Sequence, residues 1–166
     1  DLGSFLEDEE TRVVYWGTTG ERIKTTHAFS ALDRASFLQN GQLLLGRDVR
    51  RHFEMPDFQE ILAATGEHLT SIETHGAGSR SIYAYGWLLD AARCMYTLVN
   101  GRLTTKTEAA QWALDERLCP CPAELSMALT VRRQPELIHD DSVLAYAETL
   151  TDAIQNYAAL VRKAFE

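Results

Sequence analysis

The longest apolar stretch of this 166-residue chain is IYAYGWLLDAARCMYTLV, residues 82–99. A polar, glycine-containing segment at residues 74–79 precedes it, and Asn100-Gly101 follows it. An Asn-Gly pair is a common helix end, because glycine readily adopts the left-handed conformation that closes the last turn. These signals predict one long central helix, with a loop at residues 74–79 before it.

Further helices are predicted on both sides of this stretch. Upstream, Pro56-Asp57 supplies a helix start. Downstream, the spacing Thr105-x-x-Glu108 is a capping box that starts the helix after the central one. Pro122 starts the next helix, which ends near residue 131. Residues 140–165 are predicted to form one final helix. The inward positions predicted for the final helix are Val143, Leu144, Ala147, Leu150, Ile154, Tyr157 and Val161.

The predicted fold class is therefore mainly α. Five helices are expected after residue 56, and short connections favour an antiparallel, up-and-down bundle. The first fifty residues read differently. Residues 12–16, RVVYW, predict a short strand, residues 28–39 predict a helix that ends at Asn40-Gly41, and Leu43-Leu44-Leu45 predict a short buried strand.

Composition excludes several functional classes. The formal net charge is −8 and no run of Lys or Arg occurs, so a nucleic-acid interface or an anionic-membrane surface is not expected. No stretch approaches the roughly 18 apolar residues of a membrane helix, and a cytoplasmic location is expected. Because the chain starts at Asp1 rather than Met, we expect residues upstream of it.

The three cysteines are expected to be thiols. They are Cys94, Cys119 and Cys121, an odd number without secretory context. The segment Cys119-Pro120-Cys121-Pro122 has no neighbouring His or Cys pair that would complete a tetrahedral zinc site. We therefore predict no metal site in this chain.

Residues 88–113 read LLDAARCMYTLVNGRLTTKTEAAQWA. The pattern places an Arg and an aromatic residue on a helix, then a Gly-basic-aliphatic turn, a Lys, an Ala pair and Trp-Ala. It resembles the helical C-terminal domain of streptomycin/spectinomycin-type aminoglycoside adenylyltransferases, a family of the nucleotidyltransferase superfamily. A weaker match upstream resembles the segment that joins the nucleotidyltransferase domain to this bundle. The resemblance implies that residues 1–52 are the end of that domain and its linker, and that residues 53–166 are the C-terminal domain.

The family transfers AMP from ATP, with Mg²⁺, to a hydroxyl of an aminoglycoside, which confers antibiotic resistance. The resemblance implies that Arg93 and Lys106 contact the nucleotide phosphates and that this chain forms one wall of the acceptor site. The metal-binding carboxylates lie on the family's N-terminal domain, in a Gly-Ser…Asp-x-Asp signature. Neither Gly3-Ser4 nor Gly78-Ser79 is followed by that signature here. No catalytic residue is assigned to this chain, and it is expected to be inactive alone.

Two interpretations stay open for each candidate residue. Arg93 faces either a phosphate or Asp90 one turn earlier, and Lys106 either contacts a phosphate or is a solvated surface residue. Tyr83, Tyr85 and Trp87 either stack on a small-molecule acceptor or belong to the helix core. No carboxylate occurs between residues 74 and 89, so the acceptor class stays open as well.

Two other functional classes are alternatives to the adenylyltransferase interpretation. One is a ligand-free helical module that binds another protein through an apolar face. The other is a hydrolase that uses His27, His52 or His75, and the sequence offers no nucleophile and acid to accompany them.

Overall fold

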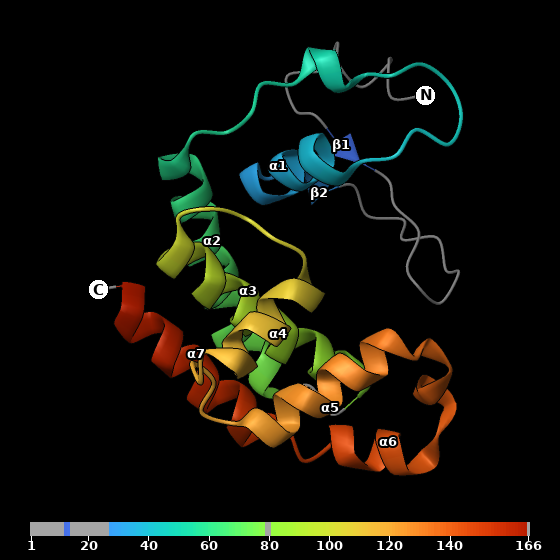
Figure 1. The fold of residues 1–166 in the computed structure, drawn as a ribbon, viewed down its shortest axis with the longest axis vertical. Coiled ribbons are helices and arrows are strands. Elements are labelled where there is room, and N and C mark those ends of the chain that lie inside the picture. Colours follow the sequence, from blue (N-terminus) through green and yellow to red (C-terminus); the bar gives the residue numbers. More distant parts are fainter. Residues whose placement is uncertain (1–11, 14–26, 79–80, 166) are drawn as a thin grey trace. The chain divides into compact units, whose positions relative to one another are not determined.

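The computed structural model describes residues 12–13, 27–78 and 81–165 and is mainly helical (Figure 1), as predicted. The chain divides into two compact units, Asp1–Ala64 and Thr65–Glu166. None of the described helices combines the length and the apolar character that are needed to cross a bilayer.

The first unit has a two-stranded sheet and a short helix. Strand β1 (Arg12–Val13) pairs antiparallel with β2 (His27–Ala28), and helix α1 (Ala31–Asn40) follows. Residues 14–16 of the predicted strand lie outside the described residues. Ser30 and Asp33 form a capping box at the start of α1. Three aromatic rings, of Phe29, Phe37 and Phe53, pack edge to face with centroids 5.4 to 5.8 Å apart.

The prediction of a buried strand at Leu43-Leu44-Leu45 is wrong. These residues lie in a loop between α1 and the 3-10 helix η2 (Arg50–His52), and the exposed fractions of Leu44 and Leu45 are 92% and 94%. A strand requires a neighbouring strand with which to exchange backbone hydrogen bonds. In the described part of the chain, β1 and β2 pair only with each other, and the leucine run has no such neighbour.

Helix α2 (Phe58–His75) starts where Pro56-Asp57 predicted. The Asp57 side chain accepts a hydrogen bond from Glu60 N at 2.8 Å, and the Glu60 carboxylate accepts one from Asp57 N at 3.0 Å. This helix extends into the segment that was predicted to be a loop, and the 3-10 helix η3 (Gly76–Gly78) follows it. A Cβ atom on Gly76 would lie 3.1 Å from both Trp87 and Ile154, so glycine allows a close approach here.

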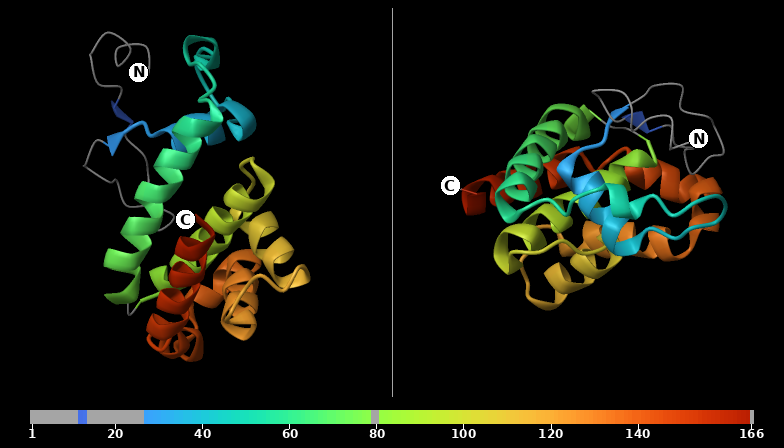
Figure 2. Two further views of the ribbon diagram at one scale, coloured as in Figure 1. Left: turned by 90° about the vertical axis from the view of Figure 1, so that its left-hand side faces the viewer. Right: turned by 90° about the horizontal axis from the view of Figure 1, so that it is seen from above.

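The second unit is built around the predicted central helix, α3 (Tyr83–Asn100). It contacts α4 (Lys106–Asp115), α5 (Pro122–Arg133) and α7 (Thr151–Phe165), and Figure 2 shows the helices of this unit gathered around it. The core includes large side chains such as Leu88, Leu125 and Tyr157. Alanines are also prominent on α3 and α4, and six of them have no exposed surface: Ala84, Ala91, Ala92, Ala109, Ala110 and Ala113.

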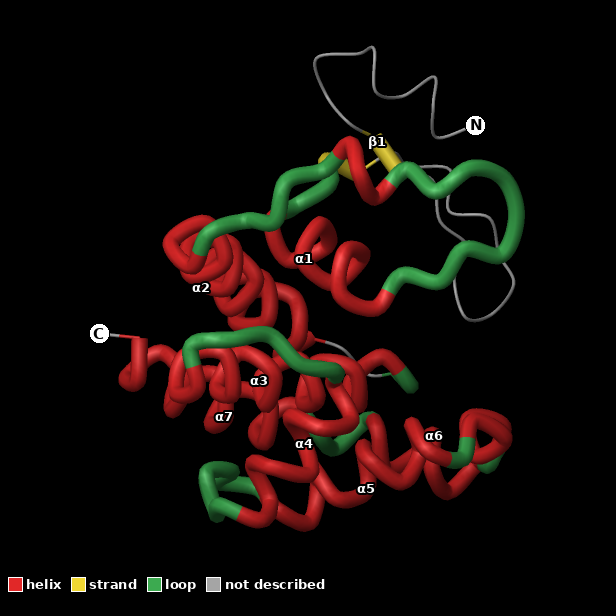
Figure 3. The backbone as a smooth tube through the Cα atoms, turned by 45° about the horizontal axis from the view of Figure 1, so that its top comes forward, coloured by secondary structure: helices red, strands yellow, loops and turns green. Residues whose placement is uncertain are grey.

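The single final helix predicted at residues 140–165 is instead two helices, α6 (Asp141–Ala147) and α7, preceded by the 3-10 helix η4 (Pro135–His139). In Figure 3 the described residues of the second unit are helices and loops. The Thr149 hydroxyl donates to the Tyr146 carbonyl at 2.8 Å, and such a local bond competes with the helical pattern. The described residues after 56 thus form six α-helices rather than five. Leu144, predicted to face inward, is 37% exposed, whereas Val143, Ala147 and Leu150 are buried.

Candidate functional site

Two capped helix ends hold Arg93 and Lys106 in place. Helix α3, which carries Arg93, ends at Gly101 in the left-handed conformation (φ 66°), and the Gly101 N–H donates to the Thr97 carbonyl at 3.0 Å. The predicted capping box of α4 is present: the Thr105 hydroxyl accepts from Glu108 N at 3.2 Å, and the Glu108 carboxylate accepts from Thr105 N at 3.3 Å. Lys106 is therefore the first residue of α4.

Both cations converge on Asp90. Lys106 Nζ donates to Asp90 Oδ2 at 2.8 Å, and Arg93 Nη2 lies 3.2 Å from Asp90 Oδ1. A third residue, His68 of α2, places its Nε2 atom 3.4 Å from the same Oδ1 atom. We call these four residues, Asp90, Arg93, Lys106 and His68, the Asp90 cluster. All of them lie in the second unit.

The carboxylate of this cluster is ionised despite its burial. Asp90 is only 6% exposed, and burial by itself would raise its pKa. The neighbouring His68, together with the charges of Lys106 and Arg93, outweighs this effect and lowers the pKa of Asp90 to about 2. Cys94, one residue beyond Arg93, responds in the opposite direction: burial first, and then the charge of Asp90, raise the pKa of its thiol to about 12.

The cations are less buried than the carboxylate that they share. The exposed fraction is 22% for the Arg93 side chain and 27% for the Lys106 side chain, against 8% for the side chain of Asp90. One ammonium and one guanidinium on a single carboxylate leave a net positive charge even when His68 is neutral. Such an arrangement can attract and hold an anion at its exposed side.

Arg93 thus makes the contact with Asp90 that was one of its two predicted alternatives. Lys106 is not a freely solvated residue, because its ammonium is bound to the same carboxylate. The sequence does not predict that Lys106 joins Arg93 at Asp90, nor that His68 lies beside them. Helix periodicity placed Asp90 and Arg93 on one face, but the sequence carries no signal that brings His68 from another helix to them.

The three aromatic candidates are not brought together on one surface. Tyr83 is 62% exposed. Tyr85 is buried, and its hydroxyl donates to the Val143 carbonyl at 2.8 Å, so it is a core residue. The Trp87 ring is partly buried and lies near that of His68, with the centroids 6.3 Å apart. Of the three residues, only Tyr83 and Trp87 therefore remain candidates for stacking on an acceptor.

The remaining histidine candidates give no catalytic arrangement among the described residues. His52 is exposed and accepts a hydrogen bond from Arg51 Nε at 3.3 Å, and His75 is exposed at the end of α2. The side chain of His27 lies outside the described residues. Across the described ranges, no group of three or more His, Cys, Asp or Glu side chains is arranged to hold a metal ion.

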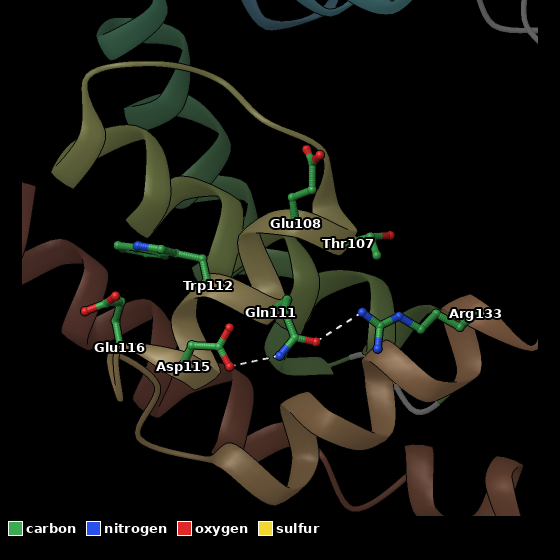
Figure 4. Close-up of a pocket in the computed structure, with 7 residues that line it drawn as sticks. All are labelled: Thr107, Glu108, Gln111, Trp112, Asp115, Glu116 and Arg133. Atoms are coloured by element: carbon green, nitrogen blue, oxygen red, sulfur yellow. Dashed lines mark hydrogen bonds between the residues drawn. The ribbon is translucent and has the colours of Figure 1, made fainter.

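An open pocket lies on α4 and the end of α5, and Figure 4 shows its lining. Gln111 bridges it: Gln111 Oε1 accepts from Arg133 Nη2 at 3.1 Å, and Gln111 Nε2 donates to Asp115 Oδ1 at 3.0 Å. Trp112 and Glu116 lie on the opposite side from Arg133. None of the predicted site residues lines this pocket, and its carboxylates make it a poor place for a phosphate.

Comparison with known proteins does not place the chain in a family. A scan against protein-family models, a search of curated proteins and a search of solved structures each found no match.

Proposed function

We propose that this chain is the accessory C-terminal domain of an ATP-dependent nucleotidyltransferase of the aminoglycoside adenylyltransferase type, in which an antiparallel helical bundle contributes cations to the ATP phosphates. The observation that carries the proposal is the convergence of two partly exposed cations, Arg93 from α3 and Lys106 from α4, on the buried carboxylate of Asp90. These are the two residues that the family resemblance assigns to phosphate contact.

The local electrostatics suit a phosphate. Lys106 occupies the first turn of α4, where free backbone N–H groups and the helix dipole already favour an anion. A lysine at this position opposes the dipole unless a negative group lies nearby. Asp90 supplies that negative group in the absence of nucleotide, and phosphate oxygens would add a second one.

Asp90 does not use all of the donors of the two cations. An ammonium has three N–H donors and a guanidinium has five. Among the described residues, Lys106 donates to Asp90 Oδ2, and Arg93 contacts Asp90 through Nη2. Asp90 would therefore act as an internal counterion that keeps both side chains in position while their remaining donors meet the phosphates.

The transfer reaction itself is assigned to an N-terminal nucleotidyltransferase domain. In the described part of the chain, the two cations share a single carboxylate, that of Asp90. A Mg²⁺ ion that bridges nucleotide phosphates is commonly held by a pair of other carboxylates. The three exposed leucines at residues 43–45 support the existence of a partner domain, because covering exposed apolar side chains is favourable. The 166-residue chain is accordingly expected to be inactive alone.

The acceptor is proposed to be a small molecule, with an aminoglycoside as the family precedent. Tyr83 offers an exposed ring at the start of α3, and Trp87 lies one turn later, next to His68. An exposed aromatic ring can stack on a sugar face. A polycationic drug would in addition need carboxylates that the N-terminal domain would have to provide.

The test is ATP use by the full-length protein with Lys106→Ala and Arg93→Ala. Each variant removes a charge-assisted hydrogen bond to phosphate, which contributes about 1.5–3 kcal/mol, so a loss of about ten- to a hundred-fold in kcat/KM for ATP is expected. Lys163→Ala, in the last turn of α7, is the matched control and should leave ATP use unchanged. Thermal unfolding of each variant checks that the fold persists.

A second candidate is the ligand-free helical interaction module. The observation that favours it is that Asp90 already pairs with both cations, so the Asp90 cluster can also be a structural ion-pair network. Wild-type ATP kinetics in both variants would support this alternative. A loss of stability in proportion to the loss of activity would point the same way.

A further inference from the structure

The turn between α4 and α5 holds two cysteines in contact. The sulfur atoms of Cys119 and Cys121 lie 3.6 Å apart, with only Pro120 between the two residues in the sequence. Pro122 is the first residue of α5, so prolines flank Cys121 on both sides. Proline fixes its own φ angle and restricts the residue before it, which lowers the entropy lost when the two sulfurs are brought together.

The two thiols differ in accessibility. Cys121 is 8% exposed, belongs to the core, and has its sulfur 3.6 Å from the Ala153 carbonyl of α7. Cys119 is only partly buried at the edge of the same core. The third cysteine, Cys94, is 3% exposed within α3. A disulfide from solution therefore has access to Cys119 before the other two.

We propose that Cys119 and Cys121 form a thiol–disulfide exchange site, which reacts with small-molecule disulfides such as glutathione disulfide and closes into an intramolecular disulfide. Cys119 attacks as the thiolate, the disulfide bond of the small molecule breaks, and one thiol leaves with a proton. Cys121 then loses its proton and attacks the Cys119 sulfur of the mixed disulfide, which releases the second thiol. The dithiol is oxidised by two electrons, and one small disulfide is reduced to two thiols.

The pair is polarised in the direction that this reaction needs. The two sulfur atoms lie within hydrogen-bond distance of each other, and the hydrogen bond with Cys121 lowers the pKa of Cys119. The same bond, followed by burial, raises the pKa of Cys121 well above its usual range. Cys119 is thus the better thiolate and Cys121 the resolving thiol.

A buried tyrosine is influenced electrostatically by the pair. The hydroxyl of Tyr157, which is completely buried, has no hydrogen-bond partner among the described residues. Burial, and then the charges that Cys119, Cys121 and Cys94 would carry as thiolates, raise the pKa of Tyr157. The sulfurs must approach by about 1.5 Å to reach a bonded separation of roughly 2.05 Å.

The experiment exposes the reduced 166-residue chain to glutathione disulfide, stops the reaction with acid, and maps the cysteines by mass spectrometry without reduction. We expect a Cys119–Cys121 link that has lost two hydrogen atoms, with Cys94 still a thiol. Cys121→Ser should accumulate glutathione on Cys119, and Cys119→Ser should react at least about tenfold more slowly than the wild type. Cys94→Ser is the matched control and should form the link at the wild-type rate.

Three results would overturn the proposal. The first is wild-type protein that collects glutathione on Cys119 without closing the link. The second is a Cys119→Ser variant that reacts as fast as the wild type. The third is equal rates of closure for the folded chain and for the chain in urea, since the folded turn would then contribute nothing. The wild-type map needs no substitution and is therefore informative even if a variant fails to fold.

Discussion

Two aspartates in different parts of the molecule share a pKa of about 2 for different physical reasons. Asp48, in an exposed loop of the first unit, accepts hydrogen bonds from the Arg50 side chain and backbone, and these lower its pKa. Asp90, in the second unit, is buried, and its neighbours must first overcome the cost of burial. The comparison teaches that a lowered pKa does not by itself measure what an ion pair contributes to the fold. Burial decides that contribution, because solvent screens an exposed pair.

Replacing the buried carboxylate should have the largest effect. Asp90→Asn leaves Lys106 and Arg93 close together without a counter-charge, and such a loss costs about 2–3 kcal/mol of unfolding free energy at pH 7. Urea denaturation followed by circular dichroism measures it. An unchanged free energy of unfolding would mean that solvent already compensates these cations.

Acid should remove the contribution of Asp90 to the stability of the fold. The pKa of Asp90 is lower in the folded chain than its usual value of 3.8, so its ionisation stabilises the fold above about pH 4. This stabilisation is lost as the pH falls from about 4 to about 2, and the shift corresponds to about 2 kcal/mol. Stability curves of wild type and Asp90→Asn should converge across this interval. Parallel curves would contradict the assignment.

Removal of one cation should cost less than removal of the shared carboxylate. After Lys106→Ala, Asp90 keeps Arg93 and His68 as neighbours, and the ammonium that was lost was partly exposed. We expect a decrease of about 1 kcal/mol in the free energy of unfolding, measured in urea. A cost equal to that of Asp90→Asn would show that Lys106 alone holds the Asp90 cluster together.

The exposed pair should give the smallest effect. Asp48→Asn removes a contact that faces solvent in a loop, and we expect no measurable change in thermal unfolding at pH 7. Repeating the measurement at low and high salt sharpens the comparison, because only an exposed pair is strongly screened. A clear loss of stability here would remove the distinction between the two aspartates.

The sequence predicted features that depend on near neighbours and missed those that depend on distant ones. The start of α4 follows from Thr105 and Glu108, three residues apart, and the capping box is present. The break between α6 and α7 was missed, because the apolar spacing continues through Leu150 without interruption. The leucine run at residues 43–45 was misassigned, because a short apolar segment does not reveal whether another strand lies beside it.

The same difference between near and distant neighbours applies to the candidate site. Asp90 and Arg93 are one turn apart on a single helix, and their contact was among the predicted alternatives. The bond from Lys106 to Asp90 joins residues 16 positions apart, and it depends on how α4 turns back toward α3. No local pattern predicts that geometry, and none predicts the contribution of His68.

The small side chains on α3 and α4 have a consequence for how the protein could vary over evolution. Ala91, Ala92, Ala109, Ala110 and Ala113 are wholly buried, and the distance between packed helices depends on the size of the side chains between them. A mutation to valine at Ala109 or Ala110 would press on the neighbouring helices and would alter the reach of Lys106 without touching a charge. The Asp90 cluster therefore depends partly on residues that carry no functional group. We expect these alanines to accept substitutions as rarely as the charged residues that they help to position.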